Sequence, residues 1–438
     1  MNRQTPIKTV SFHTLGCKLN QAETDAIAAD FKSQGYKIVP FRKVADLIVI
    51  NTCTVTDKAD SKSRQMIRNA IKASPRGRIV AMGCYAQIRP EELSAIDGID
   101  MVLGTNEKYH LLQFLKELES GNHAEPLVYV NDIGDITSYH ESPFISTTGR
   151  TRAYLKIQEG CDYYCSYCII PFARGKARSR PFYDCLNEAR SLVEKGYREL
   201  ILTGINVGTW HEDDRQLADL LDGLSSVAGL ERIRVSSIEP NTVSERLLEM
   251  VAERDNICPH LHIPLQSGSP AVLRRMRRKY LLQDYYGLAE RIAKIAPDIA
   301  WGTDIITGFP GETEDEFQQT ISAIQELPFT YLHIFRYSER YGTIASKLPG
   351  KVDFQVKKKR AVILRELSTK KKRKYIQKYI GRDQLVLFET TDTQGLFTGM
   401  TPNYIRVKVE SDQALTNTIQ TVKIIRDLGL YVEGQLLS

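Results

Sequence analysis

The chain has 438 residues, of which 42% are hydrophobic and 26% are charged. This balance is typical of globular domains and excludes collagen-like, coiled-coil and wholly disordered classes; at roughly 150 residues per domain, the length predicts about three domains. The formal net charge is +6, from 59 basic and 53 acidic residues, so a polyanionic partner is indicated only where the basic surplus is clustered.

No apolar secretory segment follows Met1, and no run of about 18 apolar residues predicts a membrane span. Eight cysteines are too few for a disulfide scaffold in a chain of this length. We therefore expect a cytoplasmic protein with reduced thiols, in which closely spaced cysteines indicate metal or redox chemistry.

The first 120 residues alternate strand and helix patterns, which favours the α/β class and an open parallel sheet domain over residues 5–120. Asn20-Gln21-Ala22-Glu23 predicts a capping box, and Gly35 ends the helix that follows it. A further helix is expected over roughly 57–74. Strands are predicted at 8–16, 46–51, 78–83 and 100–104.

Cys17, Cys53 and Cys84 each follow one of these predicted strands. Because the carboxyl ends of parallel strands meet at one edge of a sheet, we expect three thiols at that edge, where ligands bind in such folds. The alternative is three apolar core cysteines. Core cysteines should lie inside strands, however, whereas these three come after the strand ends.

Residues 121–146 show little periodicity and predict a linker. Residues 147–372 contain six strand–helix units, which predict a partial (β/α)6 barrel with its site at the carboxyl ends of the strands. Residues 373–438 contain short strands separated by Gly, Pro and Asn, a pattern typical of a small β-barrel. The six core strands are expected at 153–160, 198–204, 232–240, 260–268, 299–308 and 329–338.

Cys161, Cys165 and Cys168 form a C-x3-C-x2-C motif after the first of these strands. Three thiolates at this spacing can ligate three irons of a cubane cluster and leave the fourth iron open. Zinc would favour four ligands with paired spacing, and a thioredoxin-like motif would not carry a third cysteine. A chance grouping of core cysteines is the remaining alternative. Cys185 and Cys258 match no motif and are interpreted as structural.

This motif and its position resemble the radical S-adenosylmethionine superfamily. The resemblance implies that the three cysteines hold a [4Fe–4S] cluster whose open iron binds the methionine moiety of S-adenosylmethionine, and that cleavage generates a 5′-deoxyadenosyl radical. No catalytic residue beyond the cluster ligands is identified. Motifs after the next four strands agree with the superfamily, and the cofactor contacts that they imply are Thr203, Gly204, Asn206, Ser236, Ser237, Glu239, Gln266 and Asp304.

The whole chain resembles the methylthiotransferases within that superfamily. Asn51-Thr52-Cys53 and Gly83-Cys84-Tyr85 match the family's N-terminal domain, which implies a second [4Fe–4S] cluster on Cys17, Cys53 and Cys84. The segment 399–408 resembles a TRAM domain, a small RNA-binding barrel. The resemblance also implies a tRNA substrate and an electron donor such as flavodoxin or ferredoxin. We expect a monomer.

The segment Thr14–Glu23 (TLGCKLNQAE) looks most like the branch that methylthiolates N6-threonylcarbamoyladenosine in tRNA. The implied reaction is radical methylthiolation at C2 of that base, at position 37 beside the anticodon. Two alternatives keep the chemistry and change the substrate to N6-isopentenyladenosine or to an aspartate of a ribosomal protein. A third alternative, from another class, is an iron–sulfur protein that binds RNA without turnover.

Clustered basic residues agree with an RNA partner. One cluster follows the cysteine motif, a second lies at 274–279, and residues 351–380 hold twelve Lys or Arg against two acids. The alternative for each cluster is a solvated helix face. The RNA-binding candidates are Arg174, Arg178, Arg180, Lys371, Lys372, Arg373, Lys374, Arg406 and Lys408, and Tyr163, Tyr164 and Tyr167 are candidates for stacking on a base.

Overall fold

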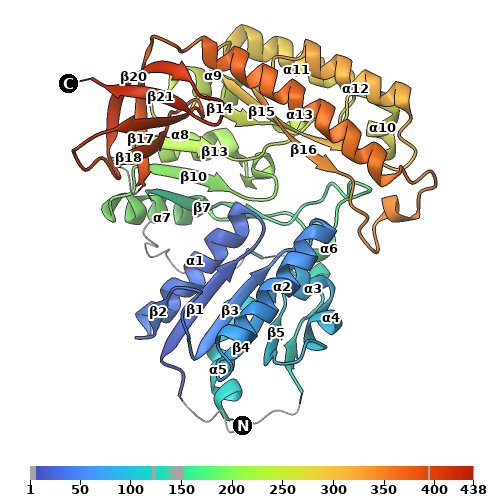
Figure 1. Cartoon of the computed structure of the whole chain (residues 1–438), viewed down its shortest axis with the longest axis vertical. Coiled ribbons are helices and arrows are strands. Elements are labelled where there is room, and N and C mark those ends of the chain that lie inside the picture. Colours follow the sequence, from blue (N-terminus) through green and yellow to red (C-terminus); the bar gives the residue numbers. More distant parts are fainter. Residues whose placement is uncertain (1–5, 121–124, 137, 140–150, 393–394, 438) are drawn as a thin grey trace. The chain divides into compact units, whose positions relative to one another are not determined.

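The computed structural model describes residues 6–120, 125–136, 138–139, 151–392 and 395–437 (Figure 1). The chain forms two compact units, each assembled from segments that are distant in sequence. The N-terminal unit contains residues 1–148, 158–180 and 338–346. The barrel unit contains residues 149–157, 181–337 and 347–438. Among the described residues, no helix is both long and apolar enough to cross a membrane.

The N-terminal unit is built on a six-stranded parallel sheet in the order β2-β1-β3-β4-β5-β6, which confirms the predicted open α/β sheet. β2 was not expected, and β6 lies within the range predicted as a linker, of which residues 121–124, 137 and 140–146 fall outside the described residues. The strands are β1 Thr9–Thr14, β2 Lys37–Val39, β3 Leu47–Thr52, β4 Arg78–Gly83, β5 Met101–Leu103 and β6 Leu127–Tyr129.

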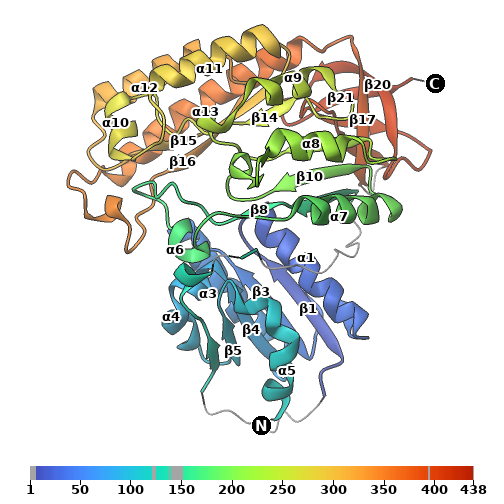
Figure 2. The same ribbon diagram turned by 180° about the vertical axis from the view of Figure 1, so that it is seen from behind.

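Helices cover both faces of this sheet. Successive side chains of a strand point to opposite faces, so Ile48 and Ile50 of β3 pack with residues of α2 and α4, whereas Leu47 and Val49 pack with residues of α1 and α5. Figure 2 shows the sheet from the side of α1 and α5. This two-sided burial explains why β3 and β4 are almost continuously apolar. The helices are α1 Lys18–Ser33, α2 Asp57–Ala73, α3 Cys84–Ile88, α4 Pro90–Ser94 and α5 Leu111–Ser120, with 3-10 turns η1 Glu107–His110 and η2 Ile133–Asp135.

The predicted capping box at Asn20 is wrong. α1 begins at Lys18, with Cys17 as its N-cap residue and no side-chain cap. The Asn20 amide instead donates hydrogen bonds to the carbonyls of Leu15 and Thr52, at 2.8 and 3.0 Å. A buried amide needs hydrogen-bond partners, and Asn20 finds them in backbone carbonyls. These bonds connect the ends of β1 and β3.

The barrel unit contains six parallel strands in two three-stranded sheets, β13-β10-β7 and β14-β15-β16. Parallel bridges between Ile233 and Ile257 and between Ser237 and His262 join the sheets, which confirms the partial barrel. The strands are β7 Arg152–Lys156, β10 Glu199–Thr203, β13 Arg232–Val235, β14 His260–His262, β15 Ala300–Thr307 and β16 Tyr331–Arg336.

The helices of this barrel alternate with its strands, as predicted. They are α7 Phe182–Glu194, α8 Leu217–Ser225, α9 Glu245–Glu253, α10 Pro270–Arg275, α11 Leu282–Ile295 and α12 Glu314–Glu326. Short elements lie between them: η3 Val207–Thr209, β11 His211–Glu212, β12 Arg215–Gln216 and η4 Pro240–Thr242. In the N-terminal unit, β8 Gln158–Glu159 pairs with β9 Arg178–Ser179, and α6 Ile170–Arg174 lies between them in sequence; η5 Ile344–Lys347 spans the boundary between units.

The end of the chain forms the predicted small β-barrel, closed in the order β17-β18-β19-β21-β20 (Figure 1). The basic helix α13 Phe354–Gln377 precedes it, so the expected boundary at 372–373 falls inside a helix. The closed barrel consists of β17 Asp383–Thr391, β18 Leu396–Met400, β19 Arg406–Glu410, β20 Ile419–Asp427 and β21 Val432–Leu436.

Two arginines of β13 fasten the C-terminal barrel to the strands of the larger one. Arg232 donates to the Met400 carbonyl at 2.9 Å, and Arg234 donates to the Pro402 carbonyl at 2.8 Å. Glu199, which is fully buried in β10, accepts from Arg234 at 2.8 Å. The carboxylate therefore compensates a buried positive charge at the junction.

Candidate active site

Three cysteines lie at the carboxyl ends of neighbouring strands in the N-terminal unit. Cys17 follows β1, Cys53 comes directly after β3, and Cys84 is the first residue of α3 after β4. Gly16 adopts a positive φ of 101°, and a Cβ atom there would lie 2.9 Å from the Cys53 sulfur. Only glycine lets the backbone before Cys17 approach Cys53 this closely. The sheet therefore brings these thiols to one edge.

Burial makes this edge unfavourable for isolated thiolates. It raises the pKa of Cys53 to about 12, and the neighbouring Cys84 and Cys17 add to the increase. Thiols must lose their protons to ligate a metal. The positive charge that would favour the thiolates comes from Arg174, which acts on Cys17 and Cys53, so the donor set and its surroundings fit an iron–sulfur cluster.

Arg174 belongs to a buried polar network beside these cysteines. Its guanidinium lies 2.7 Å from Glu23 Oε1 and 2.6 Å from Asn20 Oδ1. Lys108 Nζ lies 2.7 Å from the other oxygen of Glu23, and the Cys17 thiol donates to Asn20 Oδ1 at 3.7 Å. The side chains of Arg174, Lys108 and Glu23 are fully buried. Two cations thus share one carboxylate, which leaves a net positive charge next to the thiols.

The predicted RNA contacts of Arg174, Arg178 and Arg180 are corrected by this arrangement. All three residues are at most 5% exposed. The Arg178 guanidinium lies 2.5 Å from Glu159, and Arg174 is bound to Glu23. Side chains held inside the protein cannot reach a phosphate backbone. An arginine run in a sequence does not reveal this, because its partners lie elsewhere in the chain.

The second cysteine triad lies in the same unit, in the loop between β8 and α6. Cys161 N–H donates to the Gly175 carbonyl at 3.0 Å, and Cys168 N–H donates to the Cys165 carbonyl at 2.9 Å. Gly160 has φ of 72°, and a Cβ atom there would lie 1.8 Å from the Lys176 carbonyl oxygen. These contacts fold the loop back on itself. α6, which follows the loop, packs against α3, which begins with Cys84.

A single metal ion needs ligand atoms that all lie close to one another. Among the described residues, the group whose ligand atoms all lie within 4.8 Å of one another contains none of the cysteines. A cubane cluster places each thiolate on a different iron, so its sulfur ligands stand further apart than those around one zinc ion.

A cavity of about 390 Å³ lies beside both triads in the N-terminal unit. Its lining includes Thr54 and Ile169, the residues that follow Cys53 and Cys168. Arg340 is almost fully buried, donates to the Thr54 carbonyl at 3.1 Å and pairs with Asp60 at 2.6 Å. Burial raises the pKa of Asp60 to about 6. No sequence motif predicts this cavity, whose charged walls are Asp57, Asp60, Arg64, Arg89, Glu92, Glu339 and Arg340.

The predicted cofactor contacts lie in the barrel unit, near the carboxyl ends of its strands. Thr203 Oγ1, Ser236 Oγ and Gln266 Oε1 are buried and have no hydrogen-bond partner within the described part of the chain. A buried polar atom without a partner costs about 1–3 kcal/mol. Gln266 also adopts a positive φ of 67°. These atoms lie at successive strand ends, and a polar cofactor such as S-adenosylmethionine would supply the hydrogen-bond partners that they lack.

Other predicted contacts already have protein partners. The Glu239 carboxylate is paired with the buried side chain of Arg278. The backbone N–H of Glu239 donates to Asn206 Oδ1 at 3.4 Å. Gly204 directly follows β10. Ser237 forms a backbone bridge with His262. These residues shape the strand ends, and a direct contact with the cofactor stays a prediction for each of them.

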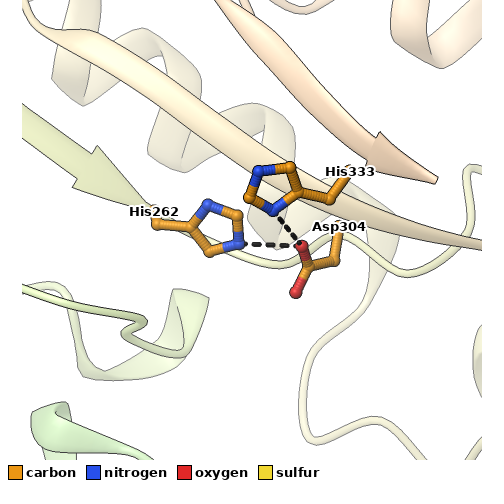
Figure 3. Close-up of side chains that lie close together, drawn as sticks. All are labelled: His262, Asp304 and His333. Carbon is orange, nitrogen blue, oxygen red and sulfur yellow. Dashed lines mark hydrogen bonds and ion pairs between the residues drawn. The ribbon is translucent and has the colours of Figure 1, made fainter. Parts of the chain in front are cut away.

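Asp304 lies between two histidines (Figure 3). Its Oδ1 is 2.9 Å from His262 Nε2 and 3.3 Å from His333 Nδ1. Burial alone raises the pKa of Asp304, but the two histidines outweigh burial and hold it below its usual value. No motif in the sequence predicts His333, because a lone histidine in a strand carries no ligand pattern.

The basic candidates near the C-terminus remain at the surface, with one exception. Lys371 Nζ donates to the carbonyls of Gln325 and Leu327, at 3.2 and 2.7 Å, and so caps the end of α12. Burial and the nearby Arg406 lower the pKa of Lys372, so the basic groups of α13 and β19 face each other. Lys408 lies 3.6 Å from Asp392. We call Lys372, Arg373, Lys374 and Arg406 the basic patch.

Comparisons with known proteins agree with this geometry. The model described as "Uncharacterized protein family UPF0004" matches residues 9–104, and the radical SAM superfamily matches residues 155–324. The threonylcarbamoyladenosine tRNA methylthiotransferase MtaB of Bacillus subtilis is 42% identical over 98% of this chain and 96% of the relative. A tRNA-2-methylthio-N(6)-dimethylallyladenosine synthase of Thermodesulfovibrio yellowstonii is 31% identical over 98% of this chain and 99% of the relative.

Solved structures support the fold. The radical S-adenosylmethionine methyltransferase TsrM from Kitasatospora setae matches with a TM-score of 0.55 at 15% identity, over 78% of this chain and 77% of that one. The radical enzyme OxsB matches with a TM-score of 0.52 at 12% identity, over 85% of this chain and 56% of that one. The near-full-length relatives, the two matched family models and the two cysteine triads together establish that this chain belongs to the methylthiotransferase family of radical S-adenosylmethionine enzymes.

Proposed function

We propose that this enzyme transfers a methylthio group to C2 of the adenine in N6-threonylcarbamoyladenosine, at position 37 of tRNA. The assignment of the substrate rests on the similarity to threonylcarbamoyladenosine tRNA methylthiotransferases, which reaches 42% identity over 98% of the chain. Two further relatives with this name are 38 and 36% identical. Relatives named for dimethylallyladenosine are 31 to 34% identical, which makes that base the second candidate.

The reaction requires radical chemistry, because the C2–H bond of adenine has neither an acidic proton nor a leaving group. A member of this superfamily uses an iron–sulfur cluster and S-adenosylmethionine, and we propose two [4Fe–4S] clusters per chain. When bound, these groups supply the electron that forms the 5′-deoxyadenosyl radical and the sulfur that is methylated and transferred. Cys161, Cys165 and Cys168 would hold the first cluster, and Cys17, Cys53 and Cys84 the second.

The chain's own residues would position the cofactor and protect the site. Thr203, Ser236 and Gln266 carry the buried atoms that lack partners, and S-adenosylmethionine offers amino, carboxylate and ribose groups to satisfy them. Asn206 would be oriented by its bond to Glu239. The charged cavity beside the two triads offers both donors and acceptors for a polar substituent on the base.

The RNA would be held by the basic patch together with Lys408. Phosphate contacts supply most sequence-independent affinity for nucleic acids. The patch joins a helix to a strand of the C-terminal barrel, and its members at 373, 374 and 406 are exposed. The expected electron donor, flavodoxin or ferredoxin, the monomeric state and the cytoplasmic location stay predictions.

A substrate comparison tests the proposal. Cluster-loaded protein is incubated anaerobically with S-adenosylmethionine, a reductant and tRNA that carries either N6-threonylcarbamoyladenosine or N6-isopentenyladenosine, and the nucleosides are measured by mass spectrometry. We expect methylthio product only from the first tRNA. Product only from the second would assign the enzyme to the other tRNA branch. Binding of tRNA without any 5′-deoxyadenosine would support the non-catalytic alternative.

A further inference from the structure

Two histidines and an aspartate converge from three neighbouring strands of the barrel unit. His262 ends β14, Asp304 lies in β15 and His333 lies in β16, and β15 pairs with both of the other strands. Asp304 and His333 are direct partners in the strand register. The three ligand atoms lie within 4.8 Å of one another (Figure 3). Because each residue is on a strand, the backbone holds this arrangement without help from a loop.

The two separations that involve Asp304 match those between ligands of one metal ion. Nitrogen and oxygen ligands lie about 2.0–2.1 Å from Zn²⁺, so two ligands at angles between about 90° and 109° stand about 2.9 to 3.4 Å apart. The observed values are 2.9 Å for His262 and 3.3 Å for His333, each measured to Asp304 Oδ1. Both values fall within the range expected for two ligands of one ion, and both are also within hydrogen-bond distance.

The surroundings of His262 support a metal-binding role. Histidine ligands usually donate their second ring N–H to a partner that fixes the ring. His262 Nδ1 lies 3.4 Å from the Tyr331 hydroxyl, and that hydroxyl lies 2.9 Å from His260 Nε2. With Nε2 on a metal, His262 would donate to Tyr331, and Tyr331 would donate to His260.

The exposure of the three side chains leaves one side of the group accessible. The side chains of His262 and Asp304 are 9% and 22% exposed, whereas that of His333 is 54% exposed. Two imidazoles and one carboxylate with open positions suit a divalent transition metal. We propose that His262, Asp304 and His333 bind one such ion, of the Zn²⁺ or Fe²⁺ class, at a site that uses none of the cysteines. This role would replace the cofactor contact that the sequence predicts for Asp304.

Cobalt titration tests this site in protein whose two triads already carry their clusters. Wild-type protein is expected to bind one equivalent of Co²⁺. The difference spectrum against the same cluster-loaded protein without cobalt should show absorption of an ion with nitrogen and oxygen ligands and no cobalt–thiolate charge-transfer band. Tyr331→Phe is expected to weaken binding by about tenfold, and His333→Ala by more. His211→Ala, which removes an exposed histidine of the same unit on β11, is the matched control and should bind as wild type does.

The outcomes separate a metal site from a hydrogen-bonded cluster. His333 is half-exposed, so its removal should leave the thermal midpoint unchanged, and a second variant, His262→Gln, removes another ligand at similar size. Absence of saturable Co²⁺ binding, equal affinity in wild type and His333→Ala, or a cobalt–thiolate band in the difference spectrum would each overturn the proposal. The assay does not depend on turnover, so its result is independent of the proposed tRNA substrate.

Discussion

Arg174 and Glu23 form a fully buried ion pair, with 2.7 Å between guanidinium Nη1 and Oε1, although they are 151 residues apart in the chain. The pair places a cation from α6, the helix that follows one cysteine triad, beside the thiols of the other. Lys108 binds the second oxygen of Glu23, so the carboxylate does not cancel both positive charges.

This charge should raise the reduction potential of a cluster on Cys17, Cys53 and Cys84, because a nearby cation favours the more negative reduced state. Arg174→Gln is expected to lower that potential by on the order of 100 mV, which corresponds to about 2 kcal/mol for a charge roughly 8 Å away at an effective dielectric constant of about 20. Redox titration monitored by EPR, in a Cys161, Cys165 and Cys168 to alanine background, isolates the signal.

Arg174→Lys is the matched variant, because it keeps the charge and changes the hydrogen-bonding geometry. Its potential should stay close to that of wild type. Equal potentials for wild type and Arg174→Gln would show that the buried cation has only a structural role.

Iron content should report two autonomous sites. Reconstituted wild-type protein is expected to hold about eight irons, four per cluster, and the Cys161, Cys165 and Cys168 to alanine variant about four. Iron and sulfide analysis with Mössbauer spectroscopy provides the measurement. Loss of all iron in this variant would mean that the N-terminal triad does not hold a cluster by itself.

The two triads should have separable roles in turnover. Without Cys17, Cys53 and Cys84, the protein should still cleave S-adenosylmethionine to 5′-deoxyadenosine, because the second triad is intact. Methylthio product should disappear with the sulfur-bearing site. Chromatography of both products from one reaction makes the comparison, and wild-type amounts of methylthiolated nucleoside from the variant would refute this division.

The basic patch should contribute to tRNA affinity. Combined Arg373→Gln, Lys374→Gln and Arg406→Gln changes are expected to weaken binding and to reduce the slope of log affinity against log salt by up to about three, one for each phosphate contact. Lys371 is left unchanged because it caps α12. Filter binding across a salt series measures the slope.

A variant with Lys37, Lys43 and Lys72 replaced by glutamine removes the same charge from exposed positions in the N-terminal unit. Its salt slope should match that of wild type. If both variants lose affinity equally, the net charge of the protein, and not the basic patch, controls binding.

Stability at acid pH should depend on Glu199. Burial alone would raise the pKa of this carboxyl, but Arg234, Arg152 and Arg232 hold it below its usual value. Because the pKa of Glu199 is lower in the folded state, its ionised carboxylate stabilises the protein at pH values above the unfolded-state pKa of about 4.3. This contribution to the free energy of unfolding is lost as the pH falls through the folded-state pKa. The free energy of unfolding of Glu199→Gln should be about 3–5 kcal/mol lower than that of wild type at neutral pH. As the pH is lowered, the variant should lose less stability than wild type does.

Thermal midpoints of both proteins between neutral and acid pH provide the measurement. The curves should converge as the wild-type carboxylate is protonated. Midpoints that stay separated by the same interval at every pH would exclude an ionised Glu199 as the source of the difference.

The sequence by itself determined the fold class and the cysteine triads. Continuous apolar strands such as β3 and β4, the alternation of strands with helices, and the short strands after Gly381 are local patterns, and the structure confirms the elements that they predict. Cys161, Cys165 and Cys168 are grouped by spacing alone. Cys17, Cys53 and Cys84 could be grouped because parallel strands end at a common edge, which is a property of the fold class.

Only the tertiary structure decided which charged residues are available to a ligand. The burial of Arg174 depends on Glu23 and Asn20, and the cap formed by Lys371 depends on the end of α12. His262, Asp304 and His333 meet because β15 pairs with β14 on one side and with β16 on the other. Residues 158–180 and 338–346 join the N-terminal unit, although the sequence predicts them within the barrel core. The free energy of a charged side chain is set by the partners that surround it, and those partners are distant in sequence.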